Sequence, residues 1–134
     1  MRAEMILVAL MTIAATEAVA LESYECNVKE GMSLSEDGSL QKKGGFADIA
    51  VGTKFTVDRR TGRVLGKISN HNAYGQPKVI DPGSSEQSFK AITIYQPNVT
   101  VDLLIIQQFS DSPEKPFIFL FYNTSVLSGT CTET

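Results

Sequence analysis

Beyond its first twenty residues, the chain consists of short apolar segments separated by glycine, proline, asparagine and aspartate. Apolar positions tend to alternate with polar ones, and helical spacing is hard to find. Strands are predicted near residues 24–28, 32–34, 39–41, 55–58, 63–66, 78–81, 89–95, 99–109, 117–122 and 126–131. The irregular segment 43–53 contains FADIA, which could form one helical turn. Short strands at such spacing are typical of a single-domain, all-β antiparallel barrel or sandwich of about eight strands, in which some of these segments join, and the pattern leaves barrel and sandwich open.

The first twenty residues follow a different pattern. Arg2 precedes an apolar run over residues 5–15, and Ala18-Val19-Ala20 offers the small residues that a signal peptidase accepts. The run is shorter than the ~20 residues needed to cross a bilayer, so no membrane span is expected after cleavage. We predict a signal peptide over 1–20 and a β domain over 21–134 in a periplasmic or secreted protein. The alternative is a buried N-terminal helix of a cytosolic protein.

Two cysteines lie near the two ends of the predicted β domain, Cys26 and Cys131. An even number in an exported chain favours a structural disulfide, which here would close almost the whole domain into one loop. The bond requires the first and last strands to be neighbours, with Cα atoms within about 7 Å. The alternative is a redox pair, which normally lies close in sequence as in C-x-x-C.

The stretch FTVDRRTGRVLG, residues 55–66, predicts a β-hairpin. Asp58 can accept hydrogen bonds from backbone N–H groups of the turn, and Gly62 can adopt the left-handed conformation that ends it. This register pairs residue 57 with 64, 56 with 65 and 55 with 66, and it lays Phe55 over the bare backbone of Gly66. It leaves the arginines at the tip solvated.

The same hairpin belongs to a basic segment. Residues 42–67 contain seven basic and two acidic residues, whereas the rest of the predicted mature chain is acidic. Arg59, Arg60, Arg63 and Lys67 are therefore a candidate patch for an anionic partner. The alternative is ordinary solvated surface charge. Nucleic acid is not expected as a partner, because the whole chain is acidic and no aromatic residue is interleaved with these arginines.

Two later strands, VTVDLLIIQQF and PFIFLFY, are apolar at successive positions, which predicts two largely apolar faces. Paired across the loop 110–116, they are expected to place Val101, Leu103, Ile105, Phe109, Phe117, Phe119 and Phe121 in the core. Leu104, Ile106, Ile118, Leu120 and Tyr122 would form the second face, with Asp102 and Gln108 at its margins. That face needs a cover, which could be segment 43–53, a homodimer partner or a ligand inside a barrel.

No catalytic or metal-binding motif is recognisable in the sequence. His71 is the only histidine, so neither a zinc site nor a Ser-His-Asp triad is expected. No phosphate loop or dinucleotide fingerprint is present, and no cofactor is predicted. The carboxylates lie in turns and loops, where turn chemistry accounts for them. We therefore predict a protein that is not an enzyme.

Several segments carry a resemblance to known proteins. SYEC, FTVDRRTGRVLG, VIDPGSSEQSFK and LSGTC resemble small exported bacterial β-proteins of unknown function. Tyr24-Glu25-Cys26 with the late Cys131 is also similar to the bacterial C-type lysozyme inhibitors, which are small disulfide-bonded β-barrels that plug the lysozyme cleft with a loop. That resemblance implies inhibition of a lysozyme-like hydrolase. The central inhibitory motifs of that family have no counterpart in this chain, so no residue role is transferred.

These observations together predict an exported β protein with a non-catalytic binding or envelope-associated role. Its partner would be a protein or envelope ligand of unknown identity. The alternatives are an inhibitor of a lysozyme-like hydrolase, a small-molecule-binding β-barrel and, last, a small hydrolase.

Overall fold

The computed structural model describes residues 22–42, 44–68, 74–97 and 100–134, and the predicted signal peptide lies outside these residues. The elements in chain order are β1 Ser23–Leu34, β2 Leu40–Gln41, α1 Gly45–Ala50, β3 Lys54–Asp58, β4 Val64–Gly66, β5 Tyr74–Pro82, β6 Phe89–Gln96, β7 Thr100–Ile106, β8 Lys115–Phe121 and β9 Ser125–Glu133. The all-β prediction is confirmed, and the first two predicted strands are one continuous strand, β1.

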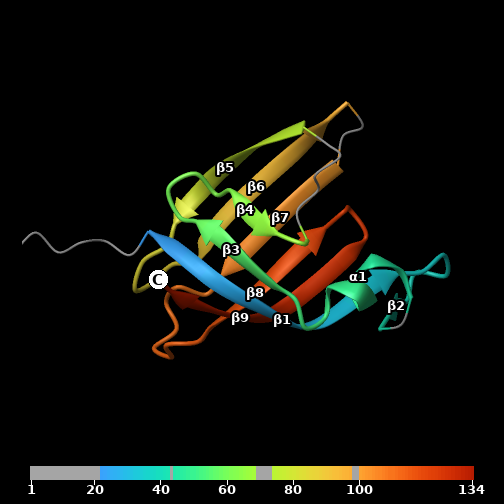
Figure 1. Ribbon diagram of the computed structural model, residues 1–134, viewed down its shortest axis with the longest axis horizontal. Helices are drawn as coiled ribbons and strands as arrows, with labels where there is room; N and C mark the ends of the chain where they lie inside the picture. Colours follow the sequence, from blue (N-terminus) through green and yellow to red (C-terminus); the bar gives the residue numbers. More distant parts are fainter. Residues whose placement is uncertain (1–21, 43, 69–73, 98–99) are drawn as a thin grey trace, which may run out of the picture.

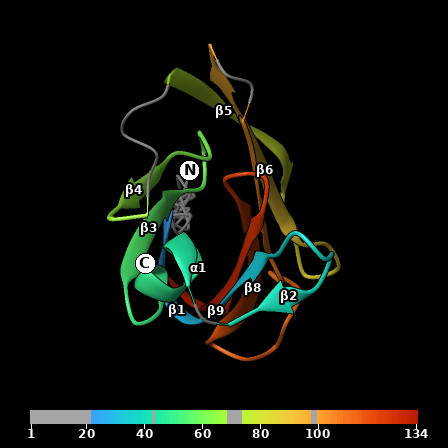
Figure 2. The same cartoon turned by 90° about the vertical axis from the view of Figure 1, so that its right-hand side faces the viewer.

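The strands form one antiparallel sheet in the order β4-β3-β1-β9-β8-β7-β6-β5, with β2 paired to β1. The sheet curls into a half-barrel, which Figure 1 shows from the side and Figure 2 after a quarter turn. Its two end strands, β4 and β5, do not pair with each other, so the barrel stays open between them.

The first and last strands lie side by side, and the disulfide joins them. Cys26 of β1 stands directly opposite Cys131 of β9, with Cα atoms 4.0 Å apart. Both residues are fully buried in the concave side of the sheet. In a chain-entropy model, closing a loop of this length is worth roughly 4–5 kcal/mol, less any strain. The predicted disulfide is therefore confirmed.

The side chains of the sheet alternate between a concave face, which forms the core, and a convex outer face. The core contains large rings and aliphatic groups from six strands: Tyr24, Val28, Phe55, Val57, Phe89, Ala91, Leu104, Ile106, Phe117, Phe119, Phe121 and Leu127. Phe55 packs edge-on against Phe117, with ring centroids 5.2 Å apart.

The predicted faces of β7 and β8 are wrong, because the odd-numbered residues of β7 share a face with the even-numbered residues of β8. Leu104 pairs with Phe119, and Ile106 pairs with Phe117, so both aliphatic residues point into the core. A shift of one residue turns every side chain of a strand to the opposite face. The true convex partners are Leu103 with Leu120 and Ile105 with Ile118.

The described part of the predicted cover, residues 44–53, lies on the concave side rather than the convex one. The short helix α1 packs on β1 and β9, and its Phe46 ring stacks on Phe121 with centroids 5.0 Å apart. Gly31 of β1 permits this approach, since a Cβ atom there would lie within 2.4 Å of the Ala47 carbonyl oxygen. The predicted helical turn is confirmed, but it closes one end of the half-barrel and does not cover the convex face.

The face assignment can be tested on two neighbouring leucines. Leu104→Ala should lower the free energy of unfolding by about 2–5 kcal/mol, because it leaves a cavity in the core. Leu103→Ala, on the half-buried convex side, should cost about 1 kcal/mol. Urea unfolding of both variants measures the difference. Equal losses, or a larger loss for Leu103→Ala, would contradict the register.

Candidate functional site

The β3–β4 hairpin has the conformation expected from its sequence. Val57 pairs with Val64, and Phe55 pairs with Gly66. The Asp58 carboxylate accepts hydrogen bonds from the backbone N–H groups of Arg60 and Thr61, at 2.8 and 3.1 Å. These bonds hold the pKa of Asp58 below its usual value. Gly62 ends the turn with a positive φ of 79°.

The tip of this hairpin folds over toward the far end of the sheet. A Cβ atom at Gly62 would lie 3.1 Å from Cβ of Ala91 on β6 and 3.4 Å from Cγ2 of Val79 on β5. The tip thus contacts β5 and β6 without strand pairing. Away from this contact, the two open edges of the sheet border a groove.

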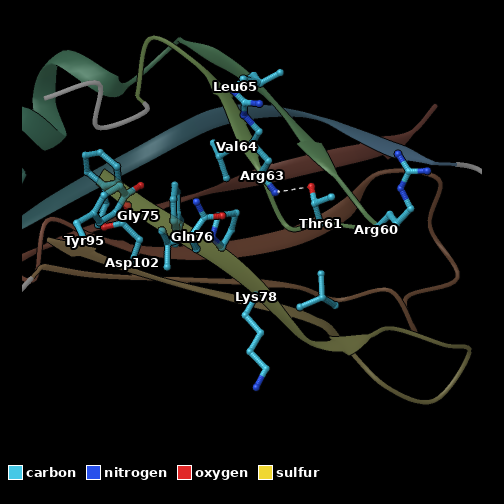
Figure 3. A pocket seen from close by; sticks show the side chains of 15 residues that line it. Arg60, Thr61, Arg63, Val64, Leu65, Gly75, Gln76, Lys78, Tyr95 and Asp102 are labelled. Atoms are coloured by element: carbon cyan, nitrogen blue, oxygen red, sulfur yellow. Dashed lines mark hydrogen bonds between the residues drawn. The ribbon is translucent and has the colours of Figure 1, made fainter. Parts of the chain in front are cut away.

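This groove is the candidate functional site. Its cavity volume is about 870 Å³, within the range of ~300–1,000 Å³ that small-molecule sites occupy. Its walls come from the β3–β4 hairpin and β5, and its floor comes from the concave side of β6, β7 and β8. The half-buried Val64 and Val79 and the almost fully buried Phe119 and Phe121 are its apolar lining residues. Figure 3 shows the hairpin and β5 on opposite sides of the opening.

A buried carboxylate lies at one end of the groove. Asp102 of β7 lines the cavity but is only 3% exposed. Its side chain receives hydrogen bonds from the backbone N–H of Tyr122, at 3.1 Å, and from the Tyr95 hydroxyl. Figure 3 shows Asp102 and Tyr95 close together, beside Gly75.

Asp102 also holds the turn between β8 and β9. Tyr122 and Asn123 adopt positive φ values of 57° and 64°, which residues with a Cβ seldom do. The Asp102 carboxylate accepts a hydrogen bond from the backbone N–H of Tyr122. The side-chain oxygen of Asn123 accepts a hydrogen bond from the backbone N–H of Val101, at 2.8 Å. Part of the reason for an aspartate here is therefore structural.

Burial changes the acidity of this pair. It raises the pKa of Asp102, while the bonds from Tyr122 N–H and the Tyr95 hydroxyl partly oppose that rise. Burial also raises the pKa of Tyr95, and the nearby Asp102 charge adds to the effect. Tyr95 therefore stays protonated and donates its hydrogen bond to Asp102.

The structure divides the predicted basic patch. Arg60 and Arg63 are exposed and line the groove, whereas Lys67 is exposed beyond the end of β4 and does not line it. Lys78 of β5 adds a further cation at the rim, although its side chain points away from the groove in Figure 3.

Arg59 is the exception to the prediction that the tip arginines are solvated. Its guanidinium lies 4.7 Å from the centre of the Tyr24 ring and 3.6 Å from the Glu133 carboxylate. Glu133 also accepts a hydrogen bond from the Gln108 side chain, whose carbonyl oxygen binds the Tyr24 hydroxyl at 2.5 Å. Burial raises the pKa of Tyr24 to about 12. This network fastens the hairpin to β1, β9 and the loop after β7.

The candidate apolar interface also needs correction, because two of its five residues, Leu104 and Ile106, belong to the core. Tyr122 lies in the turn after β8 and contacts Phe46 and Phe121. The aliphatic surface that remains is convex: Ile92, Ile94, Val101, Leu103, Ile105, Ile118, Leu120 and Val126. Ile94 and Ile118 are 47% and 49% exposed. A homodimer through this face stays a prediction.

Sequence reasoning missed Asp102 and Tyr95 as site residues. The available signal was a single aspartate inside the apolar run VTVDLLII, two residues before a core leucine. Charged residues are almost never fully buried without a specific partner. An aspartate on the inward side of such a strand therefore marks a structural or functional polar site.

No protein-family model matches the chain, and no curated protein or solved structure is significantly similar to it. The resemblance to lysozyme inhibitors therefore stays a prediction.

Within the described residues, no helix is long and apolar enough to cross a membrane. Over the same part of the chain, no three His, Cys, Asp or Glu side chains gather where they could hold a metal ion. His71 lies outside the described residues.

The Arg59 network gives a prediction about stability. Arg59→Ser should lower the free energy of unfolding by about 1–2 kcal/mol, because it removes a partly buried cation–π contact and an ion pair. Arg60→Ser, at the exposed neighbouring position, should change it by less than about 0.5 kcal/mol. Chemical denaturation of the two variants makes the comparison. Equal stabilities would contradict the packed position of Arg59.

Asp102 gives a prediction about pH. Because its folded-state pKa is raised, Asp102 favours folding at pH values below its unfolded pKa of about 3.9 and loses that contribution as pH rises through the folded pKa. Asp102→Asn carries no charge at this position. Its free energy of unfolding relative to wild type should therefore increase as pH rises from about 3 to about 7.

Asp37→Asn is the control, because the pKa of Asp37 is shifted in the opposite direction from that of Asp102. Hydrogen bonds from the Ser35 and Ser39 hydroxyls lower the pKa of Asp37 to about 2. The Asp37 carboxylate stabilises the folded state above its unfolded-state pKa, and this stabilisation is lost as pH falls through the folded-state pKa. Relative to wild type, Asp37→Asn should therefore become less stable as pH rises from about 3 to about 7. Urea titrations at several pH values measure both trends. Parallel trends for the two variants would contradict the burial of Asp102.

Proposed function

We propose that the chain is an exported, non-catalytic binding protein that holds a small molecule in the groove of its half-barrel. The observation that carries this proposal is the open groove of about 870 Å³ with the buried Asp102 at its end. Binding sites typically combine apolar walls with a few convergent polar groups, and this groove does so.

The chemistry of the lining favours binding over turnover. Among the described residues that line the groove, Asp102 is the one carboxylate, and neither histidine nor cysteine is present. Hydrolysis by paired carboxylates needs a second acid across the substrate, and a triad needs a nucleophile with an adjacent base. We therefore assign the groove to recognition.

The disulfide supports the part of the proposal that concerns location. A bond between Cys26 and Cys131 is consistent with an oxidising compartment, as the N-terminal sequence pattern also predicts. Export itself is testable by N-terminal sequencing of the protein recovered from the periplasm or medium.

Occupancy of the groove can be tested with the fluorescent probe anilinonaphthalene sulfonate and two adjacent substitutions on β6. Thr93 lines the groove, whereas Ile92 pairs with Leu103 on the convex face. Thr93→Trp should fill the groove and abolish most of the fluorescence gain, because the probe needs an apolar cavity. Ile92→Trp adds the same bulk outside and should leave the gain in place.

The probe also reports on exposed apolar surface, so the pattern across the two variants decides the outcome. Loss of fluorescence only in Ile92→Trp would assign the probe to the convex face and contradict a binding groove. Melting curves of both variants confirm that they remain folded.

A further inference from the structure

The buried carboxylate in the groove has no cationic partner among the contacts that the structure shows. The two ion pairs in the described part of the chain join Lys54 to Glu25 and Arg59 to Glu133. Asp102 instead receives two hydrogen bonds from uncharged donors. A carboxylate can accept about four hydrogen bonds, so acceptor capacity remains for a group that enters the groove. Burying such a charge is costly unless a cation or further donors compensate for it.

Aromatic rings line the groove together with this carboxylate. Tyr95, Phe119 and Phe121 all border the cavity. Tyr95 is half-buried, whereas Phe119 and Phe121 are only 2% and 1% exposed, and Phe46 stacks on one face of Phe121. The rings of Phe119 and Phe121 lie 5.4 Å apart between centroids. The face of an aromatic ring carries negative electrostatic potential and attracts cations, most strongly where water is excluded. Three rings and a carboxylate therefore favour the same kind of ligand group, a desolvated cation.

The arginines at the groove do not reverse this preference. Arg60 and Arg63 are exposed, so water and salt screen their charges, while Asp102 acts inside the protein where screening is weak. They disfavour a ligand whose cation would remain at the rim.

A metal ion does not fit this arrangement. Calcium and magnesium require several oxygen ligands, and a groove lined by a single carboxylate supplies too few. An organic ammonium group matches both features, because its charge meets the carboxylate and its alkyl substituents meet the rings.

We propose that the groove binds small organic ammonium compounds, with the cationic head beside Asp102 among the rings of Tyr95, Phe119 and Phe121. The uncharged part of the ligand extends toward the opening between the hairpin and β5. This inference rests on the proposed function, since it assigns a ligand class to the same groove.

The test compares choline with 3,3-dimethylbutan-1-ol. This alcohol has the shape of choline, but an uncharged carbon atom replaces the charged nitrogen. Titration of the full mature protein followed by amide-proton NMR gives both dissociation constants. Choline should bind at least about tenfold more tightly, because only choline carries the charge that the carboxylate and rings attract. Equal affinities for the two compounds would overturn the inference.

A pair of substitutions locates the effect. Asp102→Asn keeps an oxygen acceptor for Tyr122 N–H and should weaken choline binding about tenfold, because it removes the charge of the carboxylate. Asp111→Asn removes a carboxylate from an exposed loop and should change neither affinity. Undiminished choline binding by the Asp102→Asn protein would overturn the inference, and its melting curve shows whether it is folded.

Failure of the inference and failure of the proposed function give different results. If Thr93→Trp displaces the fluorescent probe but choline and its isostere bind equally or not at all, the groove is a binding site for another class of ligand. If the probe is unaffected by Thr93→Trp and neither compound binds, the groove is not a ligand site at all.

Discussion

The pairing of the first strand with the last determines the arrangement of the whole sheet. Cys26 and Cys131 face each other across β1 and β9, and the disulfide makes this pairing permanent under oxidising conditions. With β1 and β9 paired in the middle of the sheet, β4 and β5 become its two edges. The curl of the sheet then brings these edges to either side of one groove, so the position of the candidate site follows from a contact on the other side of the barrel.

Strand alternation explains what the groove contains. On β7, the period of two places Asp102 on the same side as Leu104 and Ile106, which are core residues. The neighbouring strands contribute Tyr95 and the phenylalanines of β8 to the same side. Asp102 thus has two roles: it holds the turn after β8 through a hydrogen bond, and it lines the cavity. In the proposed binding site, the structural requirement for Asp102 and its role toward a ligand support each other.

The sequence predicted local features well and long-range placement less well. The hairpin register at residues 55–66, the turn roles of Asp58 and Gly62, and the disulfide all followed from turn chemistry and cysteine count. The faces of β7 and β8 did not, because residues 107–114 form a connection whose length does not determine which residues face each other. With both strands apolar at successive positions, a shift by one residue changes no hydrophobicity pattern. The packing of Arg59 on Tyr24 likewise depends on two segments far apart in the chain.

We expect a ligand to bind in the concave groove and not on the convex aliphatic face. The most direct measurement is intermolecular nuclear Overhauser effects between the methyl protons of choline and the protein. We expect contacts to the ring protons of Tyr95, Phe119 and Phe121, which line the groove. Contacts confined to Ile118 and Leu120 on the convex face would contradict it.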